Sequence, residues 1–174
     1  MASTLIPRPS GLSRQCFVAR YGGIYEHSPW VAEAVFAQGI ISAVDEPGVL
    51  AKRMAAIVEA AGPERQLGLL RAHPELAGRL AMAGSLTASS KAEQAAARLD
   101  ACTPAEFARF QELNSTYTAK FGFPFIIAVR GLSRSQILGA FEFRIGNEPD
   151  DEFKTALAEV HKIAHLRLEA MAAE

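Results

Sequence analysis

His73 is the residue whose type and position best suit acid–base chemistry in this sequence. It stands directly before Pro74, and a proline disfavours the helical conformation of the residue that precedes it. A helix must therefore end here, and the histidine side chain projects from a rigid stretch of backbone. Since histidine titrates near physiological pH, a residue placed in this way suits a general acid or base. A purely structural role at a helix end fits the same pattern.

Ser90, Glu93 and Gln94 are a second group of polar residues that could do chemistry. Ser90 and Glu93 have the spacing of a capping box, so we expect a helix to begin at Ser90. The first N–H groups of a helix have no partner within it, and they bind anions and polar ligands. Gln94 adds an amide donor and an acceptor. The group predicts a helix cap or a polar binding site.

Arg167 interrupts the apolar stripe of the helix expected near the C-terminus. The stripe recurs at helical spacing through Phe153, Ala156, Leu157, Val160, Ile163, Ala164 and Met171. Arginine is rarely buried without a partner. Its side chain therefore either extends to solvent from the end of the helix or reaches into a site, where it would hold a carboxylate or a carbonyl.

The segment from 123 to 131 is too apolar for an exposed loop. No other segment has the alternation of a strand, so this one would have no partner in a sheet. We expect it to be buried and extended. Its main-chain N–H groups would then need other partners, and a bound ligand could supply them. The positions concerned are Phe125, Ile126, Ile127, Ala128 and Val129.

The sequence contains no motif for a metal or a cofactor. His161 and His165 are four residues apart, but there is no HExxH glutamate and no third ligand is evident. Cys16 and Cys102 lack the spacing of a zinc site, and we expect both to be reduced thiols. No P-loop or dinucleotide fingerprint is present. We therefore expect neither a metal nor a cofactor.

Composition restricts the class of protein further. The chain has 174 residues, a formal net charge of −1 and no basic cluster, which argues against nucleic-acid binding. Its longest apolar run is far shorter than the roughly 20 residues that cross a membrane. No targeting segment is visible at the N-terminus. We expect a cytoplasmic protein.

Helix signals along the chain indicate how these residues are positioned. The length favours one domain, and frequent alanine favours helices. Start signals, either a polar cap or a proline at the first helical position, occur at Ser13, Ser28, Pro47, Pro63, Ser90, Thr103, Ser133 and Pro149. The sequence predicts an all-α fold without a sheet: a loose lead-in over residues 1–11, then one compact domain of about seven to nine helices over residues 12–172.

Taken in order, these segments resemble the OHCU decarboxylase family of urate degradation. The matching stretches are EHSPW at 26–30, HPELAG at 73–78, LT-x-x-S-x-x-EQ at 86–94, LN-x-x-Y at 113–117, KFGFPFIIAVRG at 120–131 and IAHLRL at 163–168. They extend over nearly the whole chain. The ordered set carries the resemblance, because HPELAG alone would be a weak signal.

The resemblance implies a function and a set of site residues. Family members convert 2-oxo-4-hydroxy-4-carboxy-5-ureidoimidazoline to (S)-allantoin without a cofactor, as all-α homodimers. The catalytic histidine of the family falls on His73, and its acidic partner falls on Glu93. Its substrate-binding proline, serine, glutamine and arginine fall on Pro74, Ser90, Gln94 and Arg167. We expect Arg167 to act in catalysis too, and the main chain of 125–129 to contact the substrate.

Two other classes of function remain open at this point. A hydrolase that acts on a cyclic ureide could use the same His73 and Glu93. A non-catalytic helical interaction module would leave His73, Glu93 and Arg167 as structural residues. Release of carbon dioxide distinguishes a decarboxylase from a hydrolase. A ligand-induced rise in melting temperature distinguishes either enzyme from an interaction module.

Overall fold

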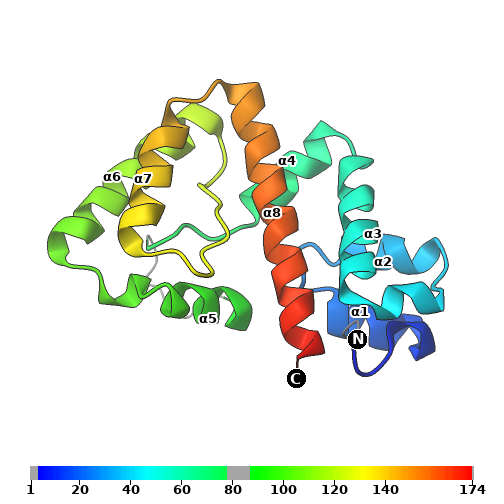
Figure 1. The fold of residues 1–174 in the computed structure, drawn as a ribbon. Helices are drawn as coiled ribbons and strands as arrows, with labels where there is room; N and C mark the ends of the chain where they lie inside the picture. The colour runs from blue at the N-terminus through cyan, green and yellow to red at the C-terminus, as the bar shows by residue number, and fades with distance from the viewer. Residues whose placement is uncertain (1–3, 78–86, 174) are drawn as a thin grey trace. The chain divides into compact units, whose positions relative to one another are not determined.

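The computed structural model describes residues 4–77 and 87–173 of the chain. Over these ranges the chain forms eight α-helices and three short 3-10 helices, and no strand is found in them (Figure 1). The α-helices are α1 (Arg14–Tyr21), α2 (Trp30–Ala37), α3 (Pro47–Glu59), α4 (Pro63–Arg71), α5 (Ala88–Ala96), α6 (Pro104–Phe121), α7 (Arg134–Ile145) and α8 (Pro149–Ala172). The expected all-α class is confirmed for the part of the chain described. None of these helices combines the length and the apolar character needed to cross a membrane.

The chain folds into two compact units. The first unit comprises Met1–Ala72 with His161–Glu174, and the second comprises His73–Val160. Helix α8 therefore contributes its N-terminal part to the second unit and its C-terminal part to the first. The expected boundary at residue 12 and the single domain over 12–172 stay predictions.

Helices α1 to α4 pack around an apolar core in the first unit. Their helical spacing buries Phe17, Val31, Val35, Leu50, Met54, Val58, Leu69 and Leu70. The chain before α1 contacts this unit through a 3-10 helix, Ser42–Asp45. The Leu5 N–H donates to the Asp45 carbonyl at 2.8 Å, and the Ser10 hydroxyl donates to the Asp45 carboxylate at 2.7 Å. The described part of the expected lead-in is thus held against the first unit, with Leu5 fully buried.

Most helix starts follow the signals in the sequence. Thr103 and Ser133 each form a complete capping box with the residue three positions later. Prolines begin α3, α4 and α8, as expected. The expected start at Ser28 is wrong by one residue. Pro29 occupies the N-cap position of α2, and no side chain caps that helix.

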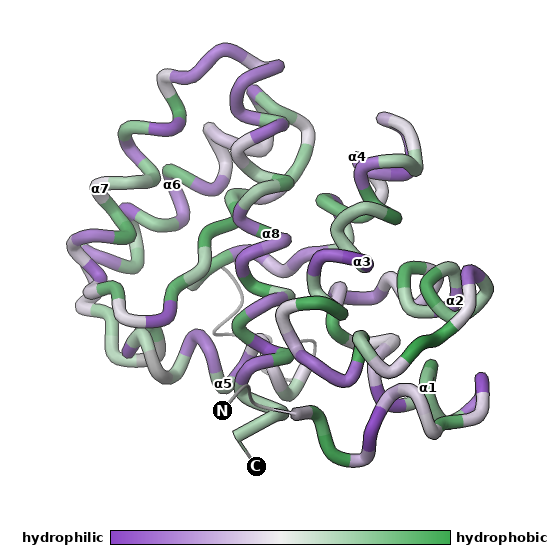
Figure 2. Tube along the Cα trace, turned by 45° about the vertical axis from the view of Figure 1, so that its right-hand side comes forward, coloured by the Kyte–Doolittle hydropathy of each residue, from purple (hydrophilic) through white to green (hydrophobic). Residues whose placement is uncertain are grey.

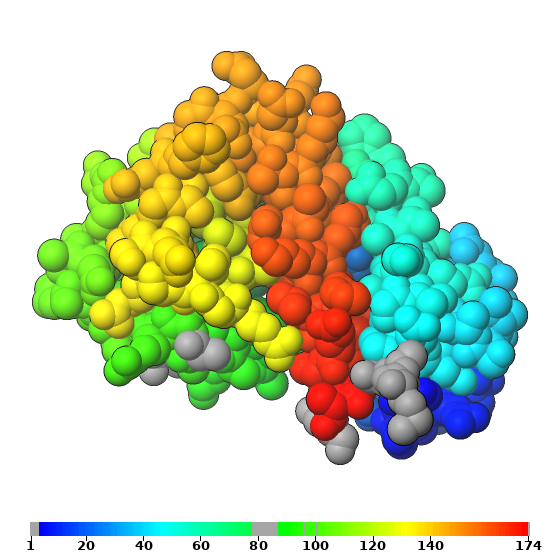
Figure 3. Space-filling model, viewed as in Figure 1, coloured from blue at the N-terminus to red at the C-terminus, as the bar shows by residue number. Residues whose placement is uncertain are grey.

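An aromatic cluster forms the centre of the second unit. Phe125 stacks on Phe141 of α7 with ring centroids 3.9 Å apart, and Tyr117 of α6 packs edge-on against both rings. The connection between α6 and α7 is green over its apolar residues in Figure 2, which agrees with their burial. Figure 3 shows α7 at the surface of this unit, so the helix buries one face and exposes the other.

Candidate active site

His73 lies just after a helix, where the sequence places it. Helix α4 ends two residues earlier, and His73 is buried, with 8% of its surface exposed. Two hydrogen bonds fix the chain that follows it. The Asn114 side chain donates to the Leu76 carbonyl at 2.9 Å, and the Ala77 N–H donates to Gln94 Oε1 at 3.3 Å. Helices α5 and α6 therefore hold in place the backbone three and four residues after His73.

The expected capping box of Ser90 and Glu93 is wrong. Helix α5 begins at Ala88, and its N-cap is Thr87, whose hydroxyl accepts the Ser90 N–H at 3.2 Å. Thr87 and Ser90 have the same three-residue spacing as Ser90 and Glu93. Only the second pair offers the acidic residue of a complete box, which explains the error. Ser90 and Glu93 both lie inside the helix.

This shift places three predicted site residues on one helical face. Ser90, Glu93 and Gln94 occupy positions i, i+3 and i+4, which lie on the same side of a helix. Ser90 and Gln94 are buried, and Glu93 is half-buried. Because Gln94 accepts the N–H of Ala77, this polar face of α5 is directed at the segment that begins with His73. The structure thus brings Gln94 into contact with Ala77, four residues after His73. Gly78 and Leu86, which belong to the matching stretches, lie outside the described residues.

The segment 125–129 is neither helix nor strand and is largely buried, as the sequence predicts. The Ile126 carbonyl accepts from Arg144 Nη1 at 2.7 Å, and the Ala128 N–H donates to Glu159 Oε2 at 2.7 Å. Ile127 differs from its neighbours because it is only half-buried. Its N–H and carbonyl have no hydrogen-bond partner among the described residues. The main chain of Ile127 is therefore available to a ligand.

The side chain of Phe125 faces the core and not a ligand. Besides its stack on Phe141, it packs under the guanidinium of Arg144, which lies 4.4 Å from the centre of the Phe125 ring. Only the main chain of Phe125 remains a candidate for substrate contact.

A buried ion pair that sequence reasoning missed supports this segment. Arg144, near the end of α7, binds Glu152 in the first turn of α8 through Nε at 2.9 Å, and Glu152 is fully buried. The Tyr117 hydroxyl and the Asn147 amide also donate to this carboxylate. Burial, and then the hydrogen bond to Glu152, raise the pKa of Tyr117 and keep it a proton donor. Basic last turns and acidic first turns are common at exposed helix ends, so no sequence signal marks this pair as buried.

Arg167 belongs to the first unit, through the C-terminal part of α8. Its Nη2 lies 2.9 Å from Glu26 Oε2, and its Nη1 donates to the Ile24 carbonyl at 3.2 Å. Both charged side chains are more than nine-tenths buried, so Arg167 does not extend to solvent. Its place on the buried stripe is confirmed. The carboxylate that it holds is that of Glu26, within the EHSPW stretch, and sequence reasoning did not identify this partner.

Comparison with known proteins adds to this geometry. A family described as OHCU decarboxylase matches residues 10–169 of the chain. The chain belongs to the OHCU decarboxylase family. A relative from Haloferax volcanii, named 2-oxo-4-hydroxy-4-carboxy-5-ureidoimidazoline decarboxylase, is 47% identical over 157 residues. The match covers 90% of this chain and 89% of that protein.

Two solved structures are similar to this member of the OHCU decarboxylase family. The crystal structure of (S)-allantoin synthase matches with a TM-score of 0.77 and 34% identity, over 97% of this chain and 53% of that one. This chain thus spans about half the length of that protein. The crystal structure of OHCU decarboxylase in the presence of (S)-allantoin matches with a TM-score of 0.66 over 87% of this chain and 96% of that one. Its identity is 21%, so it supports the fold alone.

The two histidines of α8 have separate partners within the protein. His161 lies 2.8 Å from the Tyr25 hydroxyl through Nδ1 and 2.8 Å from Glu59 through Nε2. His165 pairs with Glu169, one turn along the helix. Burial raises the pKa of Tyr25, which therefore stays a neutral phenol. In the part of the chain described, no group of three or more His, Cys, Asp or Glu side chains is arranged to hold a metal.

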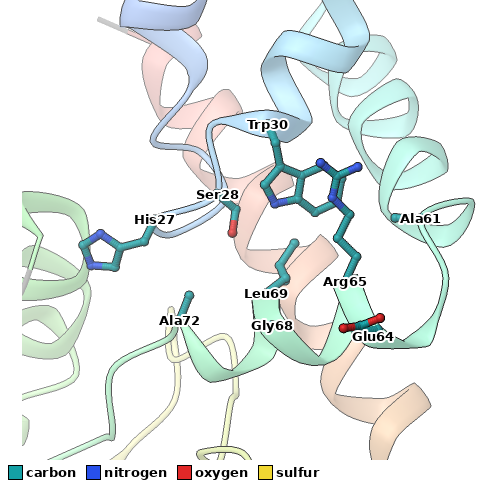
Figure 4. A pocket seen from close by; sticks show the side chains of 9 residues that line it. All are labelled: His27, Ser28, Trp30, Ala61, Glu64, Arg65, Gly68, Leu69 and Ala72. Atoms are coloured by element: carbon teal, nitrogen blue, oxygen red, sulfur yellow. The ribbon is translucent and has the colours of Figure 1, made fainter.

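A cavity of about 600 Å³ lies within the first unit (Figure 4). It is lined by His27, Ser28, Trp30, Ala61, Glu64, Arg65, Gly68, Leu69 and Ala72. The Arg65 guanidinium lies 4.4 Å from the centre of the Trp30 ring, and Figure 4 shows the two side chains against each other. No predicted site residue lines this cavity. The EHSPW stretch contributes three of its residues, His27, Ser28 and Trp30.

Proposed function

We propose that this chain catalyses the decarboxylation of 2-oxo-4-hydroxy-4-carboxy-5-ureidoimidazoline to (S)-allantoin, a step of urate degradation. Membership of the OHCU decarboxylase family and the name of its relative support the proposal. The observation that carries it is local. The hydrogen bond from Ala77 to Gln94 sets the polar face of α5 against the segment that begins at His73. The reaction requires such a combination of an acid–base residue and a polar binding face.

The proposed substrate contains its own electron sink. The ring carbon that carries the carboxylate and the hydroxyl is bonded to the carbon of a C=N bond. When carbon dioxide leaves, the electron pair of the broken C–C bond forms a C=C bond between these two ring carbons. The π pair of the C=N bond moves to nitrogen, which takes up a proton. The intermediate is an enol, so we expect no need for the pyridoxal or thiamine sinks that other decarboxylases use.

His73 would transfer the protons of this reaction. The enol hydroxyl loses its proton as its carbon becomes a carbonyl, and the neighbouring carbon gains a proton and becomes the stereocentre of allantoin. A histidine held on one side of the ring delivers that proton to one face only. Glu93 would orient the imidazole or accept N–H groups of the substrate.

The other candidate residues would hold the substrate in place. Ser90 and Gln94 offer a hydroxyl and an amide to the ureido arm, Pro74 borders the ring, and the main chain of 125–129 binds ring amides. Arg167 would polarise a carbonyl or bind an anionic group. Its ion pair with a buried glutamate would hold the guanidinium in one orientation, as contact with a single substrate atom requires.

A homodimer in the cytoplasm is also part of the proposal. Both parts are expectations that the family resemblance implies. Sedimentation equilibrium of the purified protein tests the dimer. Fractionation of the cells that produce it tests the compartment.

Substitution of His73 tests the function and the role of this residue together. The substrate decays to racemic allantoin without an enzyme, so circular dichroism of the product reports enzymatic protonation. We expect a growing signal with the wild type and a rate about 10²–10⁴-fold lower in His73→Asn. His165→Asn is the matched control, because this half-buried histidine of α8 pairs with the surface glutamate Glu169 and should leave the rate unchanged.

Each outcome decides one part of this proposal. A wild type that produces neither optical signal nor carbon dioxide would contradict the decarboxylase. Ureide hydrolysis without carbon dioxide would indicate the hydrolase. If His73→Asn folds and keeps more than about a tenth of the activity, His73 is not the acid–base residue.

A further inference from the structure

Two ions of opposite charge bind successive peptide groups on either side of Ile127. Arg144 donates to the Ile126 carbonyl at 2.7 Å, and the Glu159 carboxylate accepts the Ala128 N–H at 2.7 Å. Both are charge-assisted hydrogen bonds of short length. The first ion binds the peptide group that contains the Ile127 N–H. The second binds the peptide group that contains the Ile127 carbonyl.

Peptide geometry determines what these contacts do to Ile127. A trans peptide group is planar, and its carbonyl and N–H point in opposite directions. Neither of these two peptide bonds is cis. The Ile127 N–H therefore points away from the ion on the Ile126 carbonyl, and the Ile127 carbonyl points away from the ion on the Ala128 N–H. Both groups of Ile127 are without a partner within the described ranges.

Each ion also polarises the peptide group that it binds. A cation on the Ile126 carbonyl draws electron density through the amide and makes the Ile127 N–H a stronger donor. An anion on the Ala128 N–H has the opposite effect and makes the Ile127 carbonyl a stronger acceptor. Coupled hydrogen bonds of this kind strengthen one another by roughly 10–30% each. Ile127 thus presents one strengthened donor and one strengthened acceptor.

The surroundings of Arg144 make this arrangement rigid. Glu152 accepts from its Nε and Nη2, which leaves Nη1 for the Ile126 carbonyl. The ring of Phe125 lies under the same guanidinium. A planar guanidinium tied on two sides keeps a fixed orientation, so it fixes the carbonyl that it binds.

We propose that Arg144 and Glu159 are positioning residues that make the main chain of Ile127 a recognition edge for an amide or ureide group. The matching ligand offers a carbonyl and an N–H together, as a ureido arm or a ring amide does. The inference rests on the proposed function, because it assigns to Ile127 a defined part of the substrate contact. Arg144 and Glu159 act through the peptide groups and do not touch the substrate.

Substitution of Glu159 tests the proposal. In Glu159→Ala we expect the KM to rise about 5–10-fold with kcat within about twofold, because the Ile127 edge binds the ground state and the transition state alike. Glu159→Gln keeps an acceptor for the Ala128 N–H and should recover most of the loss. Glu169→Ala is the matched control, since this exposed glutamate of the same helix pairs with His165 and with no other side chain in the described ranges, and its KM should not change.

Amide hydrogen exchange in the substrate-free protein tests the geometry without any catalysis. The Ala128 N–H should be protected in the wild type and in Glu159→Gln, and it should exchange at least about tenfold faster in Glu159→Ala. The Ile127 N–H should exchange readily in the free protein and become protected when (S)-allantoin is added.

These measurements separate the proposal from the function on which it rests. An unchanged KM in Glu159→Ala, or an Ile127 N–H already protected without ligand, would overturn the recognition edge. A wild type without decarboxylase activity would contradict the proposed function instead. In that case, protection of Ile127 by (S)-allantoin would still support the edge, and no protection would overturn it.

Discussion

The molecule contains two buried Arg–Glu pairs, one in each unit. They are similarly buried, but their arginines contact different segments of the chain. Arg144 binds Glu152 in the second unit, and Arg167 binds Glu26 in the first. All four side chains are more than nine-tenths buried. The cost of removing two charges from water can exceed their attraction, so neither pair is explained by stability alone. What each arginine holds besides its glutamate is more informative.

Both arginines also donate to a main-chain carbonyl, but only Arg144 binds one in the candidate substrate segment, that of Ile126; Arg167 binds that of Ile24. The glutamate of the Arg144 pair also receives hydrogen bonds from Tyr117 and Asn147, as expected of a carboxylate that serves as a structural anchor. Arg167 instead lies in one of the stretches that resemble the family, and its glutamate lies in another. The first pair therefore positions a peptide group of the candidate substrate segment, whereas the expectation that Arg167 acts on the substrate rests on the family resemblance.

Arg167→Leu should have the largest effect, on activity and stability together. Leucine continues the apolar stripe and has a similar helix propensity, but the buried Glu26 loses its ion-pair partner. We expect the free energy of unfolding to fall by about 3–5 kcal/mol and kcat/KM to fall at least about 100-fold. An arginine that faced only a solvated pocket could be replaced without loss of stability, and the pair with Glu26 is the reason to expect a loss here. Urea denaturation and steady-state kinetics measure the two effects.

Adding Glu26→Leu to Arg167→Leu separates the two effects. Replacing both members of a buried ion pair by apolar residues is often neutral, so most of the unfolding free energy should return. Activity should stay lost if Arg167 acts on the substrate. Activity that returned together with stability would place Arg167 in the scaffold and make the two pairs equivalent.

Glu152→Gln should cost comparable stability but much less activity. The amide oxygen still accepts from Tyr117 or Asn147, while Arg144 loses its counter-charge, and we expect a loss of about 3 kcal/mol in the free energy of unfolding. Since Arg144 acts through the Ile126 peptide group, KM should rise while kcat stays within about threefold of the wild type. A loss of kcat as large as that of Arg167→Leu would remove the distinction between the pairs.

Local signals explain what could be predicted from the sequence. Caps and prolines gave most helix starts, because their preferences depend on a few neighbouring residues. Pro74 predicted the break at His73 for the same reason. The start of α5 shows where prediction from local signals fails. Thr87 and Ser90 are both possible N-caps, and the capping-box rule favours Ser90 because Glu93 follows it by three residues, whereas the helix uses Thr87. The error in the position of the N-cap is small, yet it changes the predicted place of Ser90 and Glu93. These residues lie inside the helix, on its polar face, and do not cap it.

Partners across long sequence separations could not be predicted in this way. Arg167 was marked as unusual by the apolar stripe, but nothing near it in the sequence points to Glu26. Glu159 follows the segment that it binds by 31 residues and stands on an amphipathic helix where a polar residue is unremarkable. Which charges become buried depends on how helices pack, and a single sequence carries no direct record of that.

Tyr117→Phe should have the smallest effect of these variants, and it tests whether the carboxylate of Glu152 is anchored from several sides. The ring contacts with Phe125 and Phe141 remain, and only the hydroxyl is lost. A hydrogen bond to a charged group contributes about 1.5–3 kcal/mol, and we expect a loss near the lower limit because Arg144 and Asn147 still bind the carboxylate. Both kinetic constants should stay at their wild-type values at neutral pH.

The pH dependence of stability makes this last test specific. Burial and the hydrogen bond to Glu152 raise the pKa of Tyr117, so the folded protein keeps a proton that the unfolded chain releases above about pH 10. The stability that Tyr117 contributes is therefore complete below that pH and declines above it. The difference in unfolding free energy between wild type and Tyr117→Phe should shrink as the pH rises beyond about 10. Tyr25→Phe is the comparison in the first unit, since burial also raises the pKa of Tyr25 but its hydroxyl contacts His161. A constant difference for Tyr117→Phe across this range would mean that burial and the hydrogen bond to Glu152 do not raise the pKa of Tyr117 in the folded protein.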